Sequence, residues 1–171
     1  MAYIKTSIAL LLVLAAGISD ATNLRQETRE LAQMTGDSDL GAALLARVNK
    51  ERASHGLPAL CSNKKLKVAA ERHVKDQSST DFMSDAGTDN STPAQRAAAA
   101  GFKCSNVKEN IDQGSPDVET VFQNWMKGEG RANILGNFNM VGTAYAYNTN
   151  TFNKHHWVQV FAVGAQETCD P

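Results

Sequence analysis

The fold is decided by residues 140–163, MVGTAYAYNTNTFNKHHWVQVFAV, which hold the clearest strand patterns of the chain. Residues 140–147 are rich in Val, Thr and Tyr, which favour strands. Residues 156–163 alternate as a half-buried strand does, with Val158, Val160 and Ala162 set against Trp157, Gln159 and Phe161. The Asn- and Thr-rich residues 148–154 between them predict a hairpin-type loop.

Helical patterns precede these strands. A capping residue at Ser38 or Asp39 opens a helix that ends by Gly56 and Pro58 and carries apolar residues at four-residue spacing, at Leu40, Leu44 and Val48. Asn63 can cap the next helix, one face of which carries Leu66, Ala70, His73 and Gln77.

Two further helices are marked by proline. Thr92-Pro93-Ala94-Gln95 is a capping box with proline at the first helical position, and Gly101 ends that Ala-rich helix. Ser115-Pro116 is interpreted in the same way, as a capping residue followed by proline at the start of a helix. This helix carries an apolar stripe of Val118, Val121, Phe122 and Trp125 and ends by Gly128 and Gly130. Helices first and long strands last indicate an α+β fold with helices packed on an antiparallel sheet.

A secretory signal peptide is expected over residues 1–21. Lys5 precedes an apolar run from Ile8 to Ala16, and Ser19-Asp20-Ala21 places small residues at both recognition positions of a cleavage site. The alternative is a buried core helix, whereas a transmembrane helix needs roughly 20 apolar residues. Residues 22–36 are interpreted as a polar lead-in and residues 37–171 as the one domain.

Charge and cysteine content narrow the class of protein. The formal net charge is −1, and Lys and Arg are scattered, whereas a nucleic-acid face needs a basic stripe. No later apolar run is long enough for a transmembrane anchor. The three cysteines lie far apart, which in an oxidising compartment favours one disulfide and one leftover thiol over a zinc site. We therefore expect a secreted, extracellular monomer.

Most of the chain after residue 36 resembles the CAP superfamily of cysteine-rich secretory proteins, antigen 5 and plant pathogenesis-related proteins, also called the SCP domain. The resemblance rests on motifs at Phe82-Met83-Ser84-Asp85, Glu109-Asn110-Ile111, Trp125-Met126, residues 131–135 and residues 156–161, and on upstream matches within residues 45–60 and 66–73. It implies a three-layer α-β-α sandwich with a small central antiparallel sheet. The chain looks like a short, microbial-type member.

The family's cleft histidines are missing from this chain. The first His position is Asp85, and the second falls in a one-residue deletion between Gly130 and Arg131. The resemblance leaves Asp85, Glu109 and Glu129 as the cleft positions, although the family's second glutamate falls where this chain has Gly128. Carboxylates alone shift preference from zinc toward calcium or magnesium. The alternative is that Glu109 only bonds backbone and Asp85 is a solvated loop residue. We expect no metal and no cofactor.

The remaining histidines are weighed as ligands. His73 is expected to be packed and hydrogen-bonded. His155 and His156 are the candidate substitute ligands, and because neighbouring strand residues point to opposite faces, only one of them can face the cleft.

In the expected fold Cys61 and Cys169 lie at neighbouring edges of the sheet. We predict that they are bridged and that Cys104 is the odd thiol, with Cys104–Cys169 as the rival pairing. Asn90-Ser91-Thr92 is a glycosylation sequon, so we expect an exposed Asn90 side chain.

The resemblance implies binding more than catalysis. No G-x-S-x-G elbow or His-Glu-x-x-His helix is present, so no catalytic residue is assigned. Relatives bind sterols or fatty acids or act as extracellular effectors or defence proteins, and lipid capture between apolar helix faces competes with their role as plain core. The expected function is a secreted, non-enzymatic protein that binds a lipid, a sterol or an extracellular protein. The alternative is a metal-dependent hydrolase or protease that uses Asp85 and Glu109.

Overall fold

A mixed sheet forms the centre of the fold. The computed structural model describes residues 39–103 and 106–171, so the expected signal peptide, the lead-in and Cys104 lie outside the described residues. The strands are β1 Cys61–Ser62, β2 Val107–Gln113, β3 Met140–Tyr147 and β4 His155–Ala162, in the order β1-β3-β4-β2. β3 and β4 pair antiparallel as the expected hairpin, and β2 pairs antiparallel with β4. The two-residue β1 pairs parallel with β3, which makes the sheet mixed.

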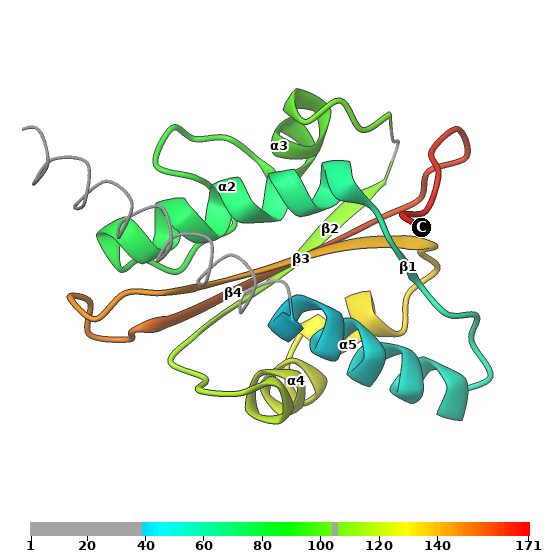
Figure 1. Ribbon diagram of the computed structural model, residues 1–171, viewed down its shortest axis with the longest axis horizontal. Helices are drawn as coiled ribbons and strands as arrows, with labels where there is room; N and C mark the ends of the chain where they lie inside the picture. The colour runs from blue at the N-terminus through cyan, green and yellow to red at the C-terminus, as the bar shows by residue number, and fades with distance from the viewer. Residues whose placement is uncertain (1–38, 104–105) are drawn as a thin grey trace, which may run out of the picture. The chain divides into compact units, whose positions relative to one another are not determined.

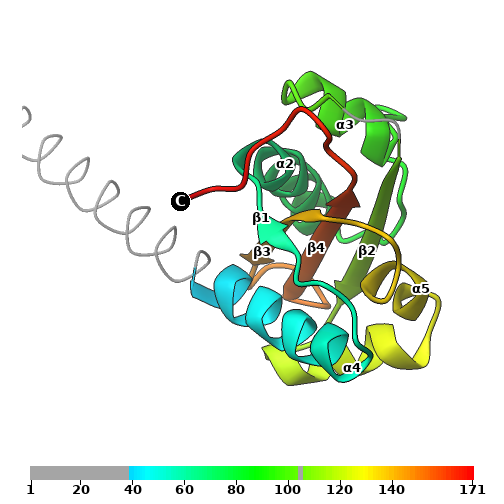
Figure 2. The ribbon, with the colours of Figure 1, turned by 90° about the vertical axis from the view of Figure 1, so that its right-hand side faces the viewer.

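Helices cover both faces of this sheet (Figure 1, Figure 2). On one face lie α2, Lys64–Thr80, and α3, Pro93–Ala99; on the other lie the N-terminal helix, described over residues 39–54, with α4, Val118–Lys127, and α5, Gly130–Ile134. Two core clusters fill the spaces between these layers. The structure therefore confirms the α+β class and the three-layer α-β-α sandwich.

Successive side chains of β4 alternate between the two core clusters. Trp157 and Phe161 are fully buried in the cluster under the N-terminal helix and α4, and Val158 and Val160 are fully buried in the cluster under α2 and α3. The stripes of the N-terminal helix and α4 also lie in the first cluster, where Leu44 and Val121 have no exposed surface. These stripes form plain core.

Side-chain caps set the helix starts. The Asn63 side chain accepts from the Lys65 and Leu66 amides at the start of α2, and Thr92 and Gln95 form the predicted capping box at α3. At α4 the expectation is wrong by two residues, because Asp117 rather than Ser115 caps the helix by accepting from the Thr120 amide. The short α5 was not expected, since five residues are too few for a periodic pattern.

The C-terminal segment is tied to β1. Cys61 and Cys169 form a disulfide with their Cα atoms 5.6 Å apart, as predicted. The Asp170 amide donates to the Ser62 carbonyl at 2.9 Å, and Asn63 Nδ2 donates to the Thr168 carbonyl at 2.9 Å. No helix within residues 39–103 and 106–171 is long and apolar enough to cross a membrane.

Candidate functional site

An open cleft of about 670 Å³ brings together the three expected acidic positions. Asp85 comes from the loop after α2, Glu109 from β2, and Glu129 from the turn between α4 and α5. The structure thus brings all three positions to one cleft, and their role there stays a prediction. The same cleft is lined by Met83, whose side chain is 59% exposed.

Asparagine side chains and close packing hold the cleft wall together. Trp125 Nε1 donates to the Ile111 carbonyl at 2.9 Å, and Asn133 Nδ2 donates to the Asn110 amide oxygen at 2.7 Å. A Cβ atom on Gly130, the first residue of α5, would lie 2.9 Å from Asn110 Nδ2 and from Trp125 Cβ, so β2 and α4 approach the start of α5 closely at this glycine. These contacts join β2 to α4 and α5 along one wall of the cleft.

Glu109 is a buried carboxylate that pairs with an arginine. Its side chain is fully buried, and Arg96 Nη2 donates to Glu109 Oε1 at 2.7 Å. The other carboxylate oxygen, Oε2, has no hydrogen-bond partner among the described residues. Removal of the Glu109 side chain would be costly, because it would leave the buried Arg96 guanidinium without this partner.

Arg96 is the site residue that sequence reasoning missed. It projects from α3, is 1% exposed, and also donates to the backbone carbonyls of Ser91 and Asp85, the latter at 2.9 Å. The guanidinium thus joins the α2–α3 loop to β2. The only sequence signal for it is that it is the single arginine of the Ala-rich helix after the capping box, and that signal does not reveal its partner.

Burial raises the pKa of Glu109 to about 8. The Arg96 guanidinium opposes this rise, and the nearby charge of Asp85 adds to it. The main cause of this rise is desolvation rather than repulsion among carboxylates. Because this pKa of about 8 is close to neutral, a modest change of pH there changes the protonation of Glu109.

His73 lies behind this pair as a neutral, packed side chain, as expected. It is fully buried, and Nε2 lies 2.9 Å from the Ser84 carbonyl. Burial, with a contribution from Arg96, lowers the pKa of His73, so its 3.6 Å approach to Glu109 Oε1 is not an ion pair at neutral pH. Because a carbonyl only accepts, the Nε2 atom carries the ring proton.

The cleft does not fit zinc. Zinc sites use at least three imidazole, thiolate or carboxylate ligands, and no group of three His, Cys, Asp or Glu able to hold a metal occurs in the described part of the chain. Asp85 and Glu129 are exposed at the rim, whereas the inner oxygen of Glu109 already binds a guanidinium.

Neither substitute histidine lines the cleft. His156 pairs with Gln113 and Glu109 with Val160, so the two side chains lie four β4 positions apart, which is about 13 Å along a strand. His156 is fully buried, with Nε2 3.4 Å from the Thr151 hydroxyl, and His155 Nδ1 lies 2.8 Å from the Tyr145 hydroxyl. The two rings do point to opposite faces, but neither is placed to replace a cleft ligand.

Asn90 satisfies the structural condition for its expected glycosylation. Its side chain is exposed, and its φ of 61° places it in the left-handed region, at the turn closed by its amide to the Gly87 carbonyl at 2.8 Å.

The chain matches one known protein family. Residues 45–161 match the sequence model of CAP, the cysteine-rich secretory protein family. A comparison with curated proteins found no match.

Three bacterial structures share the fold. An extracellular protein with an SCP domain from Bacillus anthracis has a TM-score of 0.66 and 22% identity, over 74% of this chain and 41% of that one. An outer surface protein of Borrelia burgdorferi has a TM-score of 0.66 and 15% identity, over 72% and 91% of the two chains. A cysteine-rich secretory protein from Staphylococcus aureus has a TM-score of 0.59 and 16% identity, over 74% and 39%. This chain thus matches less than half the length of two of them.

Proposed function

This chain belongs to the cysteine-rich secretory protein (CAP) family, and on that premise we propose that it is a secreted, non-enzymatic binding protein whose acidic cleft holds a basic segment of an extracellular protein. The observation that carries the proposal is the pairing of Glu109 with Arg96 in a cleft that no histidine lines. The Arg96 guanidinium binds Glu109, the residue that would bind a metal ion in a metal-dependent hydrolase.

The rim of the cleft favours a cationic partner. Two exposed carboxylates, Asp85 and Glu129, outnumber the one exposed lysine of the lining, Lys108, and the Met83 side chain offers apolar surface beside them. A lysine or arginine combines a charged end with an aliphatic stem, so it matches carboxylates next to a methionine. Lipid capture between the helices is less favoured, because the apolar stripes that it needs are packed as core.

Calorimetry with two titrants tests this proposal. A short lysine-rich peptide should bind weakly and lose affinity as salt rises, since exposed charge pairs are screened. The double variant Asp85→Asn/Glu129→Gln should lose that binding, and Glu71→Gln, an exposed carboxylate on α2 outside the cleft, should keep it. Equal binding by both variants would refute the cleft as the site.

Zinc chloride is the second titrant and tests the hydrolase alternative. We expect no tight binding, because carboxylates without imidazole are poor zinc ligands. Tight one-to-one binding that Glu109→Gln abolishes would overturn the non-enzymatic proposal and favour the metal-dependent hydrolase.

A further inference from the structure

One edge of the central sheet ends at β2. In the order β1-β3-β4-β2 this strand has β4 on one side and no strand on the other, and Figure 2 shows it between α3 and α5. Every residue from 107 to 111 lines the acidic cleft. Consecutive residues of a strand point to opposite faces, so a cleft lined by all of them lies along the edge of β2. Such an edge presents main-chain groups that can pair with another chain.

The register of β2 shows which main-chain groups face the cleft. The Asn106 carbonyl accepts from the Val163 amide at 3.3 Å, so Asn106 and every second residue after it face β4. Main-chain groups of an antiparallel strand alternate between its two edges. The N–H and C=O groups of Val107, Glu109 and Ile111 therefore face the open edge.

The carbonyls on this edge are bonded, but the amides are not. The Glu109 carbonyl accepts from Asn133 Nδ2 at 3.2 Å, and the Ile111 carbonyl accepts from Trp125 Nε1 at 2.9 Å, which agrees with their outward position. Within the described residues no acceptor bonds the amides of Val107, Glu109 or Ile111. A carbonyl has two lone pairs, so the edge can donate through its amides and still accept through its carbonyls.

The exposed carboxylates of the cleft lie on opposite sides of this edge. The Glu109 side chain points toward α3 and the loop that carries Asp85, whereas the Asn110 side chain points to the other face, where it bonds the start of α5 beside Glu129. An extended segment placed beside β2 would direct its successive side chains to these two sides. The two carboxylates outnumber Lys108, the one exposed base of the lining.

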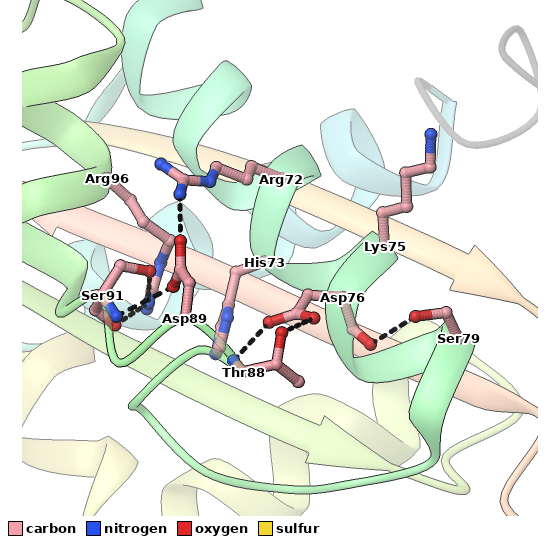
Figure 3. Close-up of a pocket in the computed structure, with 9 residues that line it drawn as sticks. All are labelled: Arg72, His73, Lys75, Asp76, Ser79, Thr88, Asp89, Ser91 and Arg96. Carbon is pink, nitrogen blue, oxygen red and sulfur yellow. Dashed lines mark hydrogen bonds and ion pairs between the residues drawn. The ribbon is translucent and has the colours of Figure 1, made fainter.

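The wall that carries Asp85 is held by its own hydrogen bonds. Asp76 of α2 accepts from the Thr88 amide at 2.8 Å and from the Thr88 hydroxyl at 2.7 Å (Figure 3). Arg96 of α3 donates to the carbonyls of Ser91 and Asp85. The loop between α2 and α3 is thus tied to both helices, and a partner that binds a preformed wall does not have to order it.

We propose that the partner's basic segment binds in an extended conformation as an added strand along the open edge of β2. Its carbonyls accept from the amides of Val107, Glu109 and Ile111, and two adjacent basic residues are directed to Asp85 and Glu129. In strand addition the main-chain hydrogen bonds supply affinity and the alternating side chains supply specificity. This proposal rests on the function proposed for the cleft and adds the conformation and the sequence pattern of the partner.

Amide NMR of the ¹⁵N-labelled protein tests for the added strand. The probe is acetyl-Thr-Val-Lys-Lys-Val-Thr-amide, whose β-branched residues favour an extended chain. Bound peptide should shift the amides of Val107, Glu109 and Ile111 downfield and slow their exchange with solvent by about tenfold or more, because a donated hydrogen bond protects an amide. The Lys108 amide, which faces β4, is the internal control and should change little.

Two further peptides of the same charge are the controls for the ligand. Acetyl-Thr-Lys-Val-Lys-Val-Thr-amide has the same composition but directs both lysines to one side. The first peptide with N-methylated lysines and valines keeps its side chains but cannot pair as a strand. Each should bind about fivefold more weakly or worse, which is the loss of about one hydrogen bond.

A matched pair of variants tests the edge of the protein. Val107 is the first residue of β2, and its amide faces the open edge, a position at which strands tolerate proline. Val107→Pro removes one donor, whereas Val107→Ala shortens the side chain and keeps the donor. The proline variant should bind the first peptide about fivefold more weakly than the alanine variant.

The outcomes separate this proposal from the function on which it rests. Binding that depends on Asp85 and Glu129 but leaves the β2 amides unchanged, or that survives N-methylation, would overturn the added strand and leave the proposed function standing. No binding of any of the peptides would overturn both. Amide shifts that grow with protein concentration alone would identify a second copy of this chain as the occupant of the edge and would also overturn the proposal.

Discussion

Glu109 keeps its proton in a pH range where an ordinary glutamate has lost it. Its pKa is raised by burial from 4.5 to about 8, so between these values the folded state binds more protons than the unfolded state. By linkage, this contribution to the free energy of unfolding is fully present below about pH 4.5 and is lost as pH rises through about 8. One proton limits the slope to about 1.4 kcal/mol per pH unit.

We therefore predict that the free energy of unfolding of the wild type falls, relative to Glu109→Gln, as pH rises from mildly acidic to about 8. His156 lies four β4 positions from Val160, the strand partner of Glu109, and is present in both proteins, so its titration cancels in the difference. Urea unfolding at a series of pH values measures it. A difference independent of pH would show that Arg96 keeps Glu109 ionised throughout.

At the residue scale, the sequence alone identified Glu109 as a cleft residue but did not identify Arg96. Glu109 was found because its motif is local, and Asp85 and Glu129 followed from the same alignment of motifs. Arg96 bonds Glu109 across 13 positions and only because α3 packs beside β2, which is a tertiary contact without a local pattern. Its partnership therefore required the structure.

At the scale of elements, α2 lies directly on β3 at a glycine. A Cβ atom on Gly142 would come 2.1 Å from the Leu66 carbonyl carbon and 2.2 Å from the Lys67 amide nitrogen, both backbone atoms that cannot swing aside. We predict that Gly142→Ala lowers the free energy of unfolding by about 3 kcal/mol or more, because overpacking forces the helix off the sheet.

Gly41 is the matched control for that substitution. It lies in the N-terminal helix, where a Cβ atom would meet the Thr143 carbonyl oxygen at 3.4 Å, an ordinary contact. Gly41→Ala should raise the free energy of unfolding by about 0.5–1 kcal/mol, since alanine favours helices over glycine. Thermal and urea unfolding of both variants measure the two effects, and equal changes in both would contradict the close approach at Gly142.

The disulfide joins β1 to the C-terminal segment and acts on the unfolded chain. Cys61 and Cys169 are 108 positions apart, and closing a loop of that length contributes about 4–5 kcal/mol in the loop-entropy description. We predict a loss of that size for Cys61→Ser/Cys169→Ser, measured by urea unfolding, with the fold retained because Asp170 still bonds Ser62 and the Lys64 amide. The reduced wild type is the control and should match the double variant. A loss under about 1 kcal/mol would contradict the loop-entropy account.

On the scale of the whole molecule, local signals predicted the layers but not every element. Asn63 and Thr92 mark the starts of α2 and α3 correctly because a side-chain cap depends on neighbouring residues alone. β1 has two residues and α5 five, so neither is long enough to show a period. The parallel pairing of β1 likewise depends on where the chain returns after α5, which no local pattern encodes.

Secretion and processing concern the whole chain. A signal peptide over residues 1–21 would deliver the protein to an oxidising compartment, where the Cys61–Cys169 bridge forms and Cys104 has no partner left. We predict that the secreted protein begins at Thr22 and carries one disulfide and one thiol. Intact mass spectrometry should give the mass of residues 22–171 less two hydrogens, and alkylation without reduction should add one label, at Cys104. A retained leader, or alkylation at Cys61 or Cys169, would contradict this processing.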